Sequence, residues 1–484
     1  MERKGVGASA AGSIFPGPTA PLVAGRTWDW RWITLSSRVG RKGKDADEGT
    51  PSVNAHSPIL TVNDNGAWCW FQDERALVDP QAQTLVVGSI AAAEGPGGEG
   101  RSGNVELAVV DLRAGTSEVV VLHEVFETDD HDVPALWRRA DGRWLAVYTK
   151  HKTDDRTRWR VSEPGDPTRW GPEREFDWSA YTGGAGVTYS NLRSMGGRLY
   201  CFARAVNDDQ CALVSDDDGD TWAYAGKLFT RPKVGYVNGY TRYAGDGKRI
   251  DLVTTDHHPR DFDNSIYHGY LENGALHRSD GTVVDAEAVS GEAPSQVELT
   301  TVLEAGSRWG GVRMSHCWTT DIRRGDDGSV AAVLTARAGD EEHLDRDRAH
   351  PDLRFFYARM APGGEWTVNE FAKAGAGLMP HEEDYTGLAA IDPYDLDSVY
   401  VSTTVDPRDG ASLAFHEIFH ARTADGGATW TWTPVTEDSE VDNLRPIVAP
   451  GDPSRTPLLW FRGTMTASQH YDCEIVLRDI PRSR

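Results

Sequence analysis

The sequence predicts an all-β protein: a seven-bladed β-propeller with a poorly structured N-terminal tail. Three observations lead to this fold class. The 484 residues include 50 glycines and 25 prolines, which indicate many turns. From about Gly66 onward one unit recurs, with an aromatic or β-branched strand, a Gly/Asp turn, a second strand and usually two weaker strands. Seven such units follow one another at the spacing expected of propeller blades, roughly 40 to 70 residues.

The units divide the chain into a tail and a propeller. They begin near Ala67, Val133, Val187, Gly239, Val312, Tyr385 and Asn443. We therefore assign residues 57–484 to the propeller and residues 1–56 to the tail. The first 50 residues contain more basic than acidic side chains, whereas the whole chain has a formal charge of -24. This difference in composition separates the tail from the rest of the chain.

Two units end in a turn of the Asp-box type, SDDDGDTW (215–222) and TADGGATW (423–430). We expect structural roles in these turns, with two aspartates holding the turns and two tryptophans packing between blades: Asp218, Asp425, Trp222 and Trp430. The stretch WCWFQDER (68–75) is predicted to close the ring. Its aromatic residues are expected to pack, and Gln72 and Arg75 are candidate channel residues.

Composition excludes several classes of protein. The charge of -24 argues against nonspecific nucleic-acid binding, which needs a basic surface. The five cysteines form no CxxC pair, so a disulfide framework is not expected. No apolar run approaches the roughly 18 residues that span a bilayer. The first 25 residues make a poor secretory signal, which favours a cytoplasmic location.

Polar residues recur at one end of the predicted blades. The innermost strand of a blade lines the channel and the second strand runs antiparallel to it, so the start of the first and the end of the second emerge on one face. Successive units place the following residues there: His131 with His151, then Tyr189 and Asn191 with Arg204, then Tyr240 and Arg242 with His257, His258 and Arg260. Later units add His316, Tyr385 with Asp406, and Arg445 with Arg462.

These residue types suit an anionic, oxygen-rich substrate. Arginine binds carboxylates in a fork, and histidine and tyrosine exchange protons when their pKa values are tuned. The paired carboxyls that most glycoside hydrolases need are not evident, because acidic candidates such as HEED (381–384) belong to a distant unit. The set instead matches β-elimination at a hexuronate, in which the neighbouring carboxylate must be neutralised before the C5 proton can leave.

Six stretches of the sequence are long and specific: GAWCWFQDERALVD (66–79), DDHDVPALWRRADGRWLAVYTKH (129–151), TYSNL (188–192), DHHPRDFDNSIYHGYLENGALHRSDGT (256–282), EEDYTGLAAIDP (382–393) and DNLRPIV (442–448). They resemble the BNR-repeat propellers that include ulvan lyases and related rhamnosyl-glucuronate lyases. The resemblance implies an active canyon on one face, with catalytic residues at positions that match His131, His151, Tyr189 and Arg204. We expect Asn191, Tyr240, Arg242 and Arg260 to bind substrate. The resemblance also implies secretion, so the location stays open.

One further cluster could hold a metal ion. His257, His258, His268, His316 and Cys317 offer imidazoles and one thiolate for a tetrahedral zinc. The alternative is plain packing and rim contacts. The resemblance favours a structural zinc at His258, His268 and Cys317, which would brace the fourth and fifth blades without a part in catalysis.

The sequence thus predicts a monomeric polysaccharide lyase that cleaves a uronate-containing glycan of the rhamnose/glucuronate type by β-elimination. Catalysis requires no cofactor in this interpretation. Two alternatives remain: a glycoside hydrolase of the same propeller family acting on rhamnosyl-glucuronate, and a carbohydrate-binding propeller without catalysis. A sialidase is disfavoured because its early arginine motif is missing and Asp-boxes are few.

Overall fold

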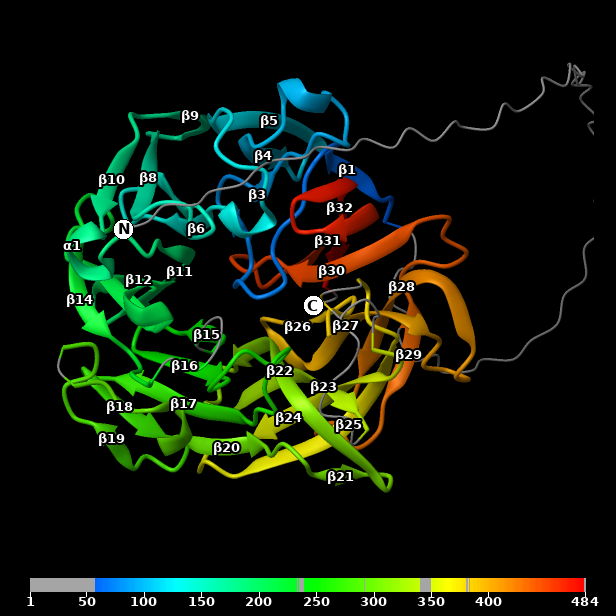
Figure 1. The fold of residues 1–484 in the computed structure, drawn as a ribbon. Coiled ribbons are helices and arrows are strands. Elements are labelled where there is room, and N and C mark those ends of the chain that lie inside the picture. The colour runs from blue at the N-terminus through cyan, green and yellow to red at the C-terminus, as the bar shows by residue number, and fades with distance from the viewer. Residues whose placement is uncertain are drawn as a thin grey trace, which may run out of the picture. The chain divides into compact units, whose positions relative to one another are not determined.

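The computed structural model describes residues 57–482 except 233, 235–238, 291, 340–349, 380–381 and 383. The predicted tail, residues 1–56, lies outside this part of the chain. The described residues are almost entirely β-structure, arranged as seven antiparallel sheets around a central channel (Figure 1). The prediction of a seven-bladed β-propeller is confirmed.

Blades one to three follow the chain, each with its innermost strand first. Blade one contains β2 (Ala76–Asp79), β3 (Thr84–Ile90), β4 (Val105–Asp111) and β5 (Thr116–His123). Blade two contains β6 (Ala135–Arg138), β7 (Trp144–Thr149), β8 (Arg156–Glu163), β9 (Asp166–Trp170) and β10 (Arg174–Asp177). Blade three contains β11 (Thr188–Met195), β12 (Arg198–Arg204), β13 (Gln210–Ser215) and β14 (Ala223–Lys227).

Blades four to six continue this order. Blade four contains β15 (Thr241–Gly245), β16 (Arg249–Thr254), β17 (Ile266–Glu272), β18 (Ala275–Arg278), β19 (Val283–Asp285) and β20 (Thr300–Leu303). Blade five contains β21 (Arg308–Trp309), β22 (Val312–Arg324), β23 (Val330–Ala338), β24 (Leu353–Met360) and β25 (Trp366–Gly375). Blade six contains β26 (Ala389–Asp392), β27 (Asp395–Val405), β28 (Ser412–Arg422) and β29 (Thr431–Pro434).

Blade seven closes the ring by combining both ends of the propeller sequence. It contains β30 (Asp442–Val448), β31 (Arg455–Ala467) and β32 (His470–Pro481), with β1 (Leu60–Asn63) as its outermost strand. Leu60 pairs with Leu477. The prediction that WCWFQDER closes the ring is therefore wrong, because the closing strand comes just before it.

Helical segments are short and lie between strands. They are α1 (Ser179–Thr182), η1 (Gly98–Gly100), η2 (Asp130–Asp132), η3 (Val206–Asp208) and η4 (Gln296–Glu298). No described helix is long and apolar enough to cross a membrane.

The strand sequences explain where the core lies. Second strands such as β7, WLAVYT, are buried along their whole length, as expected for apolar strands covered on both faces. Outer strands such as β5 remain largely exposed. The main apolar cluster combines blades one and seven with the aromatic residues of 68–71, and further clusters fill the interfaces between neighbouring blades.

The Asp-box turns are confirmed with one correction. Asp425 accepts hydrogen bonds from the backbone and side chain of Thr429, as predicted. In the other turn Asp217, not Asp218, plays this part, since it accepts from Thr221. Asp218 instead binds the indole N–H of Trp137 in the preceding blade. Its side chain therefore joins two blades rather than holding its own turn.

The segment 68–75 fills the centre of the channel and contacts several blades; we call it the channel segment. Trp70 donates its indole N–H to the Thr386 carbonyl in blade six at 2.6 Å. The backbone N–H of residue 73 donates to Asn191 Oδ1 in blade three at 3.1 Å, and the ring of residue 71 stacks on Trp318 of blade five at 4.0 Å. These contacts fix the channel segment to blades three, five and six.

Candidate active site

The hairpin of β11 and β12 brings Tyr189 and Arg204 together as predicted. Thr188 pairs with Arg204, and a bulge between Thr188 and Asn191 interrupts the ladder. Within this bulge Tyr189 has φ 66°, a left-handed conformation that is uncommon for an aromatic residue. Arg204 lies over the ring of Tyr189, 4.8 Å from its centroid. Backbone strain of this kind is characteristic of functional sites.

His131 and His151 form a stacked pair that one carboxylate holds in place. Asp129 caps η2 and receives the backbone N–H of His131 at 3.0 Å. Its Oδ1 lies 2.6 Å from His131 Nδ1, and its Oδ2 lies 3.0 Å from His151 Nδ1. The two imidazole rings are parallel within 9° and 3.8 Å apart. A single side chain therefore orients both predicted catalytic histidines.

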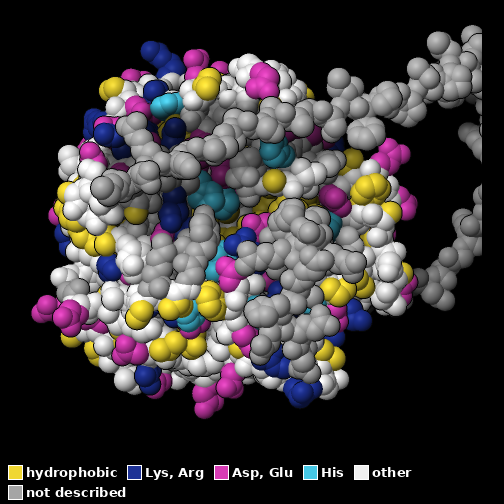
Figure 2. Space-filling model, viewed as in Figure 1, with side chains coloured by type: hydrophobic (Ala, Val, Ile, Leu, Met, Phe, Trp, Pro, Cys, Tyr) yellow, Lys and Arg dark blue, Asp and Glu magenta, His cyan; other side chains and the backbone are white. Residues whose placement is uncertain are grey.

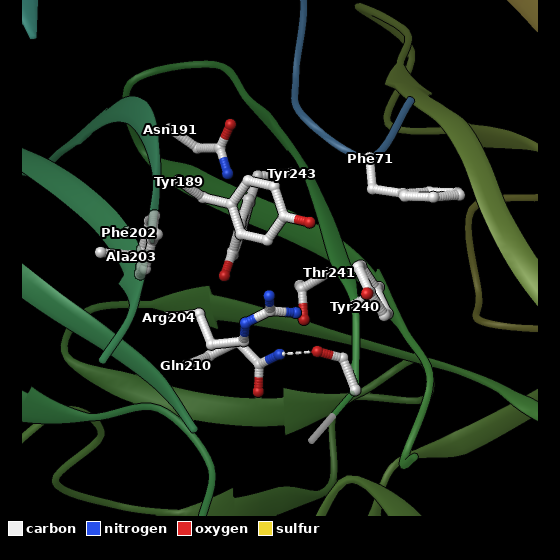
Figure 3. A pocket seen from close by; sticks show the side chains of 11 residues that line it. Phe71, Tyr189, Asn191, Phe202, Ala203, Arg204, Gln210, Tyr240, Thr241 and Tyr243 are labelled. Atoms are coloured by element: carbon white, nitrogen blue, oxygen red, sulfur yellow. Dashed lines mark hydrogen bonds between the residues drawn. The ribbon is translucent and has the colours of Figure 1, made fainter. Parts of the chain in front are cut away.

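The four predicted catalytic residues converge on one place between blades two and three. The ring of His131 lies 5.6 Å from that of Tyr189. Arg204 stands between two phenol rings, those of Tyr189 and Tyr240, at 4.8 and 5.1 Å (Figure 3). The strand geometry of adjacent blades thus assembles two imidazoles, a phenol and a guanidinium in one group.

The environments of the two histidines push their pKa values apart. Burial disfavours the charged form of His131, but its interactions with Cys69 and with the Asp129 carboxylate outweigh burial and raise its pKa well above 6.5. Burial and the neighbouring His131 cation lower the pKa of His151 to about 4. At neutral pH the pair therefore consists of one imidazolium and one neutral imidazole. Opposite protonation states in one site are typical of acid and base partners.

Tyr189 and Arg204 expose polar atoms to the inside of the site. Burial raises the pKa of Tyr189 well above 10, which keeps the phenol protonated. Burial opposes the charge of Arg204, yet the two neighbouring tyrosines raise its pKa above the usual value. Among the described residues, Tyr189 Oη and the Nε and Nη1 atoms of Arg204 have no hydrogen-bond partner. Buried donors of this kind suit an anionic ligand.

A small pocket extends inward from Arg204. The cavity has a volume of about 20 Å³. The following residues line it: Phe71, Tyr189, Asn191, Phe202, Ala203, Arg204, Gln210, Gly239, Tyr240, Thr241 and Tyr243 (Figure 3). This is room for one or two waters or a carboxylate oxygen, and not for a sugar ring. Figure 2 shows histidine and basic side chains along the hollow at the middle of this face.

The residues predicted to bind substrate divide into two groups. Tyr240 lines the pocket, as does Asn191, whose carbonyl oxygen accepts from Arg75. Arg242 instead points into the channel and donates to the Trp70 carbonyl. Arg260 forms an ion pair with Glu382 at 3.0 Å and stays partly exposed. A substrate reaches Arg260 more directly than Arg242.

The structure does not assemble the predicted zinc ligands. Among the described residues, three or more candidate ligand atoms lie within 4.8 Å of one another only in two clusters, Cys69–Asp130–His131 and Asp129–His131–His151. His268 is buried against Ser279 and Asp251 within blade four. Cys317 is a buried thiol of β22 in blade five, and His258 faces Tyr240 and Trp318. The geometry therefore does not support a zinc site at these three residues.

Sequence reasoning missed the residues that support the histidines. Asp129 stands two positions before His131, in the motif DDHD. Gln72 donates its side-chain amide to the His131 carbonyl, so the channel segment also fixes the histidine backbone. The pattern Asp-x-His at a strand entry was an available signal for Asp129, whereas the contact from Gln72 depends on the tertiary structure. Of the HEED stretch, only Glu382 and Asp384 are described.

Comparison with known protein families identifies the family of this chain. Residues 100–374 match the model of the family described as BNR repeat-containing family member. The chain belongs to this family. No curated protein matches the sequence.

Two solved structures of polysaccharide lyases share the fold of this chain. An ulvan lyase of polysaccharide lyase family PL25, solved with a bound -[GlcA(1-4)Rha3S]- ligand, is similar with a TM-score of 0.60 and 13% identity, over 87% of this chain and 97% of that chain. The polysaccharide lyase Uly1 gives a TM-score of 0.54 at 12% identity, over 88% and 99% of the two chains. At these identities the likeness concerns the fold.

Proposed function

We propose that this BNR repeat-containing protein is a polysaccharide lyase that cleaves a uronate-containing glycan of the rhamnose/glucuronate type by β-elimination. The observation that carries the proposal is the buried Arg204–Tyr189 pair beside two histidines of opposite protonation state. The names of the similar structures, two polysaccharide lyases, agree with it.

The first requirement of the reaction is a neutralised substrate carboxylate. Arg204 is buried, stays charged and has two nitrogens without an acceptor among the described residues. The His131 imidazolium, whose ring lies 5.6 Å from that of Tyr189, adds a second positive charge. With its Nδ1 hydrogen directed at Asp129, the Nε2 hydrogen of His131 remains to bind the substrate. These two cations would stabilise the negative charge that develops as C5 loses its proton.

The second requirement is a base for the C5 proton. His151 is neutral, and its Nδ1 faces Asp129, so the lone pair lies on Nε2. Its side chain is 19% exposed, compared with 6% for His131, which leaves it open to the canyon. We therefore assign proton abstraction to His151. His131 already carries its proton, and Tyr189 keeps its own, so neither takes this part.

The third requirement is a proton for the departing O4 oxygen. Tyr189 keeps its phenolic proton, and its hydroxyl has no partner among the described residues. The phenol would donate this proton as the C4–O4 bond breaks. The electron pair of the C5–H bond then forms the C4–C5 double bond, and the two products are an unsaturated uronate and a new free hydroxyl.

The test is a product analysis on glucuronate-containing glycans. Purified protein is incubated with ulvan, glucuronan and gum arabic oligosaccharides, and the unsaturated uronate is followed by ultraviolet absorbance and mass spectrometry. Lyase action yields products whose summed mass equals that of the substrate. Products heavier by one water would overturn the proposal in favour of hydrolysis, and intact substrate throughout the panel would favour a binding protein.

A further inference from the structure

The central channel beneath the candidate active site contains an excess of buried arginines. The charged side chains next to the channel segment are Asp73, Glu74, Arg75, Arg193, Arg242, Asp321, Arg323 and Arg445. Five guanidiniums thus face these three carboxylates, and Asp130, a fourth acid beside Arg445, already pairs with His131. Buried charges are costly unless they are paired, so the distribution of partners decides what this excess means.

The carboxylates are already bound by two of the arginines. Arg323 holds Glu74 at 2.6 Å and lies 3.5 Å from Asp321. Arg193 holds Asp73 at 2.8 Å. Asp321 also accepts backbone N–H groups, including that of residue 391 at 2.8 Å. None of these acids lies within ion-pair distance of the other three arginines in the described structure.

The other three arginines have only neutral hydrogen-bond acceptors among the described residues. Arg75 donates to the side-chain carbonyls of Gln72 and Asn191. Arg242 donates to the backbone carbonyl of Trp70, and Arg445 to that of Gln72. Carbonyl dipoles satisfy individual N–H groups but leave the net charge in place.

Two of these guanidiniums also retain unused donors. Arg445 Nη1 and Arg242 Nε are buried without an acceptor in the described structure. Both residues are less than 4% exposed. They come from opposite sides of the ring, blades seven and four, and reach carbonyls two residues apart on the channel segment. Burial and repulsion from Arg242 lower the pKa of Arg445 to about 9, and burial lowers that of Arg75 to about 10.

We propose that the central channel binds a small inorganic anion, with chloride as its natural probe, between Arg242 and Arg445. A monatomic anion accepts several N–H groups at once and supplies the charge that the carbonyls lack.

The first experiment measures the thermal stability of the full chain in sodium chloride and in sodium gluconate of equal ionic strength. A bound anion stabilises the folded protein by mass action, so Tm should rise with chloride in a saturable way, by about 3 °C at a hundredfold excess over the Kd. Arg445→Met should abolish this dependence. The control Arg198→Met changes an exposed arginine paired with Asp216 and should retain it.

The second experiment locates the ion and does not depend on a variant that folds. Crystals of the wild-type protein grown in bromide should show an anomalous peak between the two guanidiniums. Equal Tm values in chloride and gluconate, or bromide absent from the channel, would overturn the proposal in favour of ordered water. Neither measurement uses a glycan, so failure of the lyase assignment would leave this result unaffected.

Discussion

Replacement of Asp129 by asparagine tests the protonation states that the proposed mechanism needs. The carboxylate accepts from both imidazoles, with Oδ1 toward His131 and Oδ2 toward His151. Gln469 also donates to Oδ2. An asparagine of the same shape keeps one carbonyl oxygen and places an NH2 group at the other position. One histidine then meets a donor where it met an acceptor, and its proton must move to the other ring nitrogen.

The expected fall in kcat follows from the changed protonation of the two histidines. The charge of Asp129 is among the main causes that raise the pKa of His131, so the variant lowers this pKa and weakens the cation that faces the substrate. If His151 is the histidine that faces the NH2 group, its Nε2 becomes protonated and no longer accepts the C5 proton. Loss of one general acid or base costs about 10²- to 10⁴-fold in rate, and we expect kcat of Asp129→Asn to fall within this range.

The pH dependence provides a second readout. In the wild type, kcat/KM should rise as His151 loses its proton near pH 4 and should fall as His131 loses its proton well above pH 6.5. In Asp129→Asn the alkaline limb should move to lower pH, because His131 gives up its proton more easily. Initial rates of unsaturated-product formation across this pH range measure both limbs.

A matched variant separates this effect from general damage. Asp256 pairs with His257 Nδ1 at 3.1 Å in blade four, outside the histidine pair. Asp256→Asn should keep the wild-type pH profile and most of the rate. If Asp129→Asn retains activity within tenfold of wild type with both limbs in place, the assignment of opposite protonation states is wrong.

Three further changes probe the same site. Tyr189→Phe should fold and bind substrate with unchanged KM but nearly abolish turnover, because it removes only the phenolic proton; wild-type kcat in this variant would contradict the assignment. Arg204→Lys should lose roughly 100-fold or more in kcat/KM, as for the loss of an oxyanion donor; calorimetry should show an intact fold. Gly239→Ala should lower Tm and the folded yield, since a Cβ there would lie 1.9 Å from the Thr255 carbonyl oxygen, and an unchanged Tm would contradict this packing.

The sequence by itself determined the fold class and which residues meet in the candidate active site. Repeated strand and turn patterns specify blades, because each blade is a local meander of neighbouring strands. The same locality placed Tyr189 beside Arg204, since a hairpin with a Gly-Gly turn brings the start of its first strand next to the end of its second. His131 and His151 follow for the same reason, as they flank the first two strands of one blade.

Only the tertiary structure decided the features that depend on residues far apart in the chain. Ring closure pairs β1 with β32, and neither strand shows its partner in its own sequence. The channel segment receives arginines from blades four and seven, which meet only when the ring is closed. The predicted zinc ligands lie apart for the converse reason. His268 and Cys317 belong to the interiors of different blades, where packing against their own sheets fixes them.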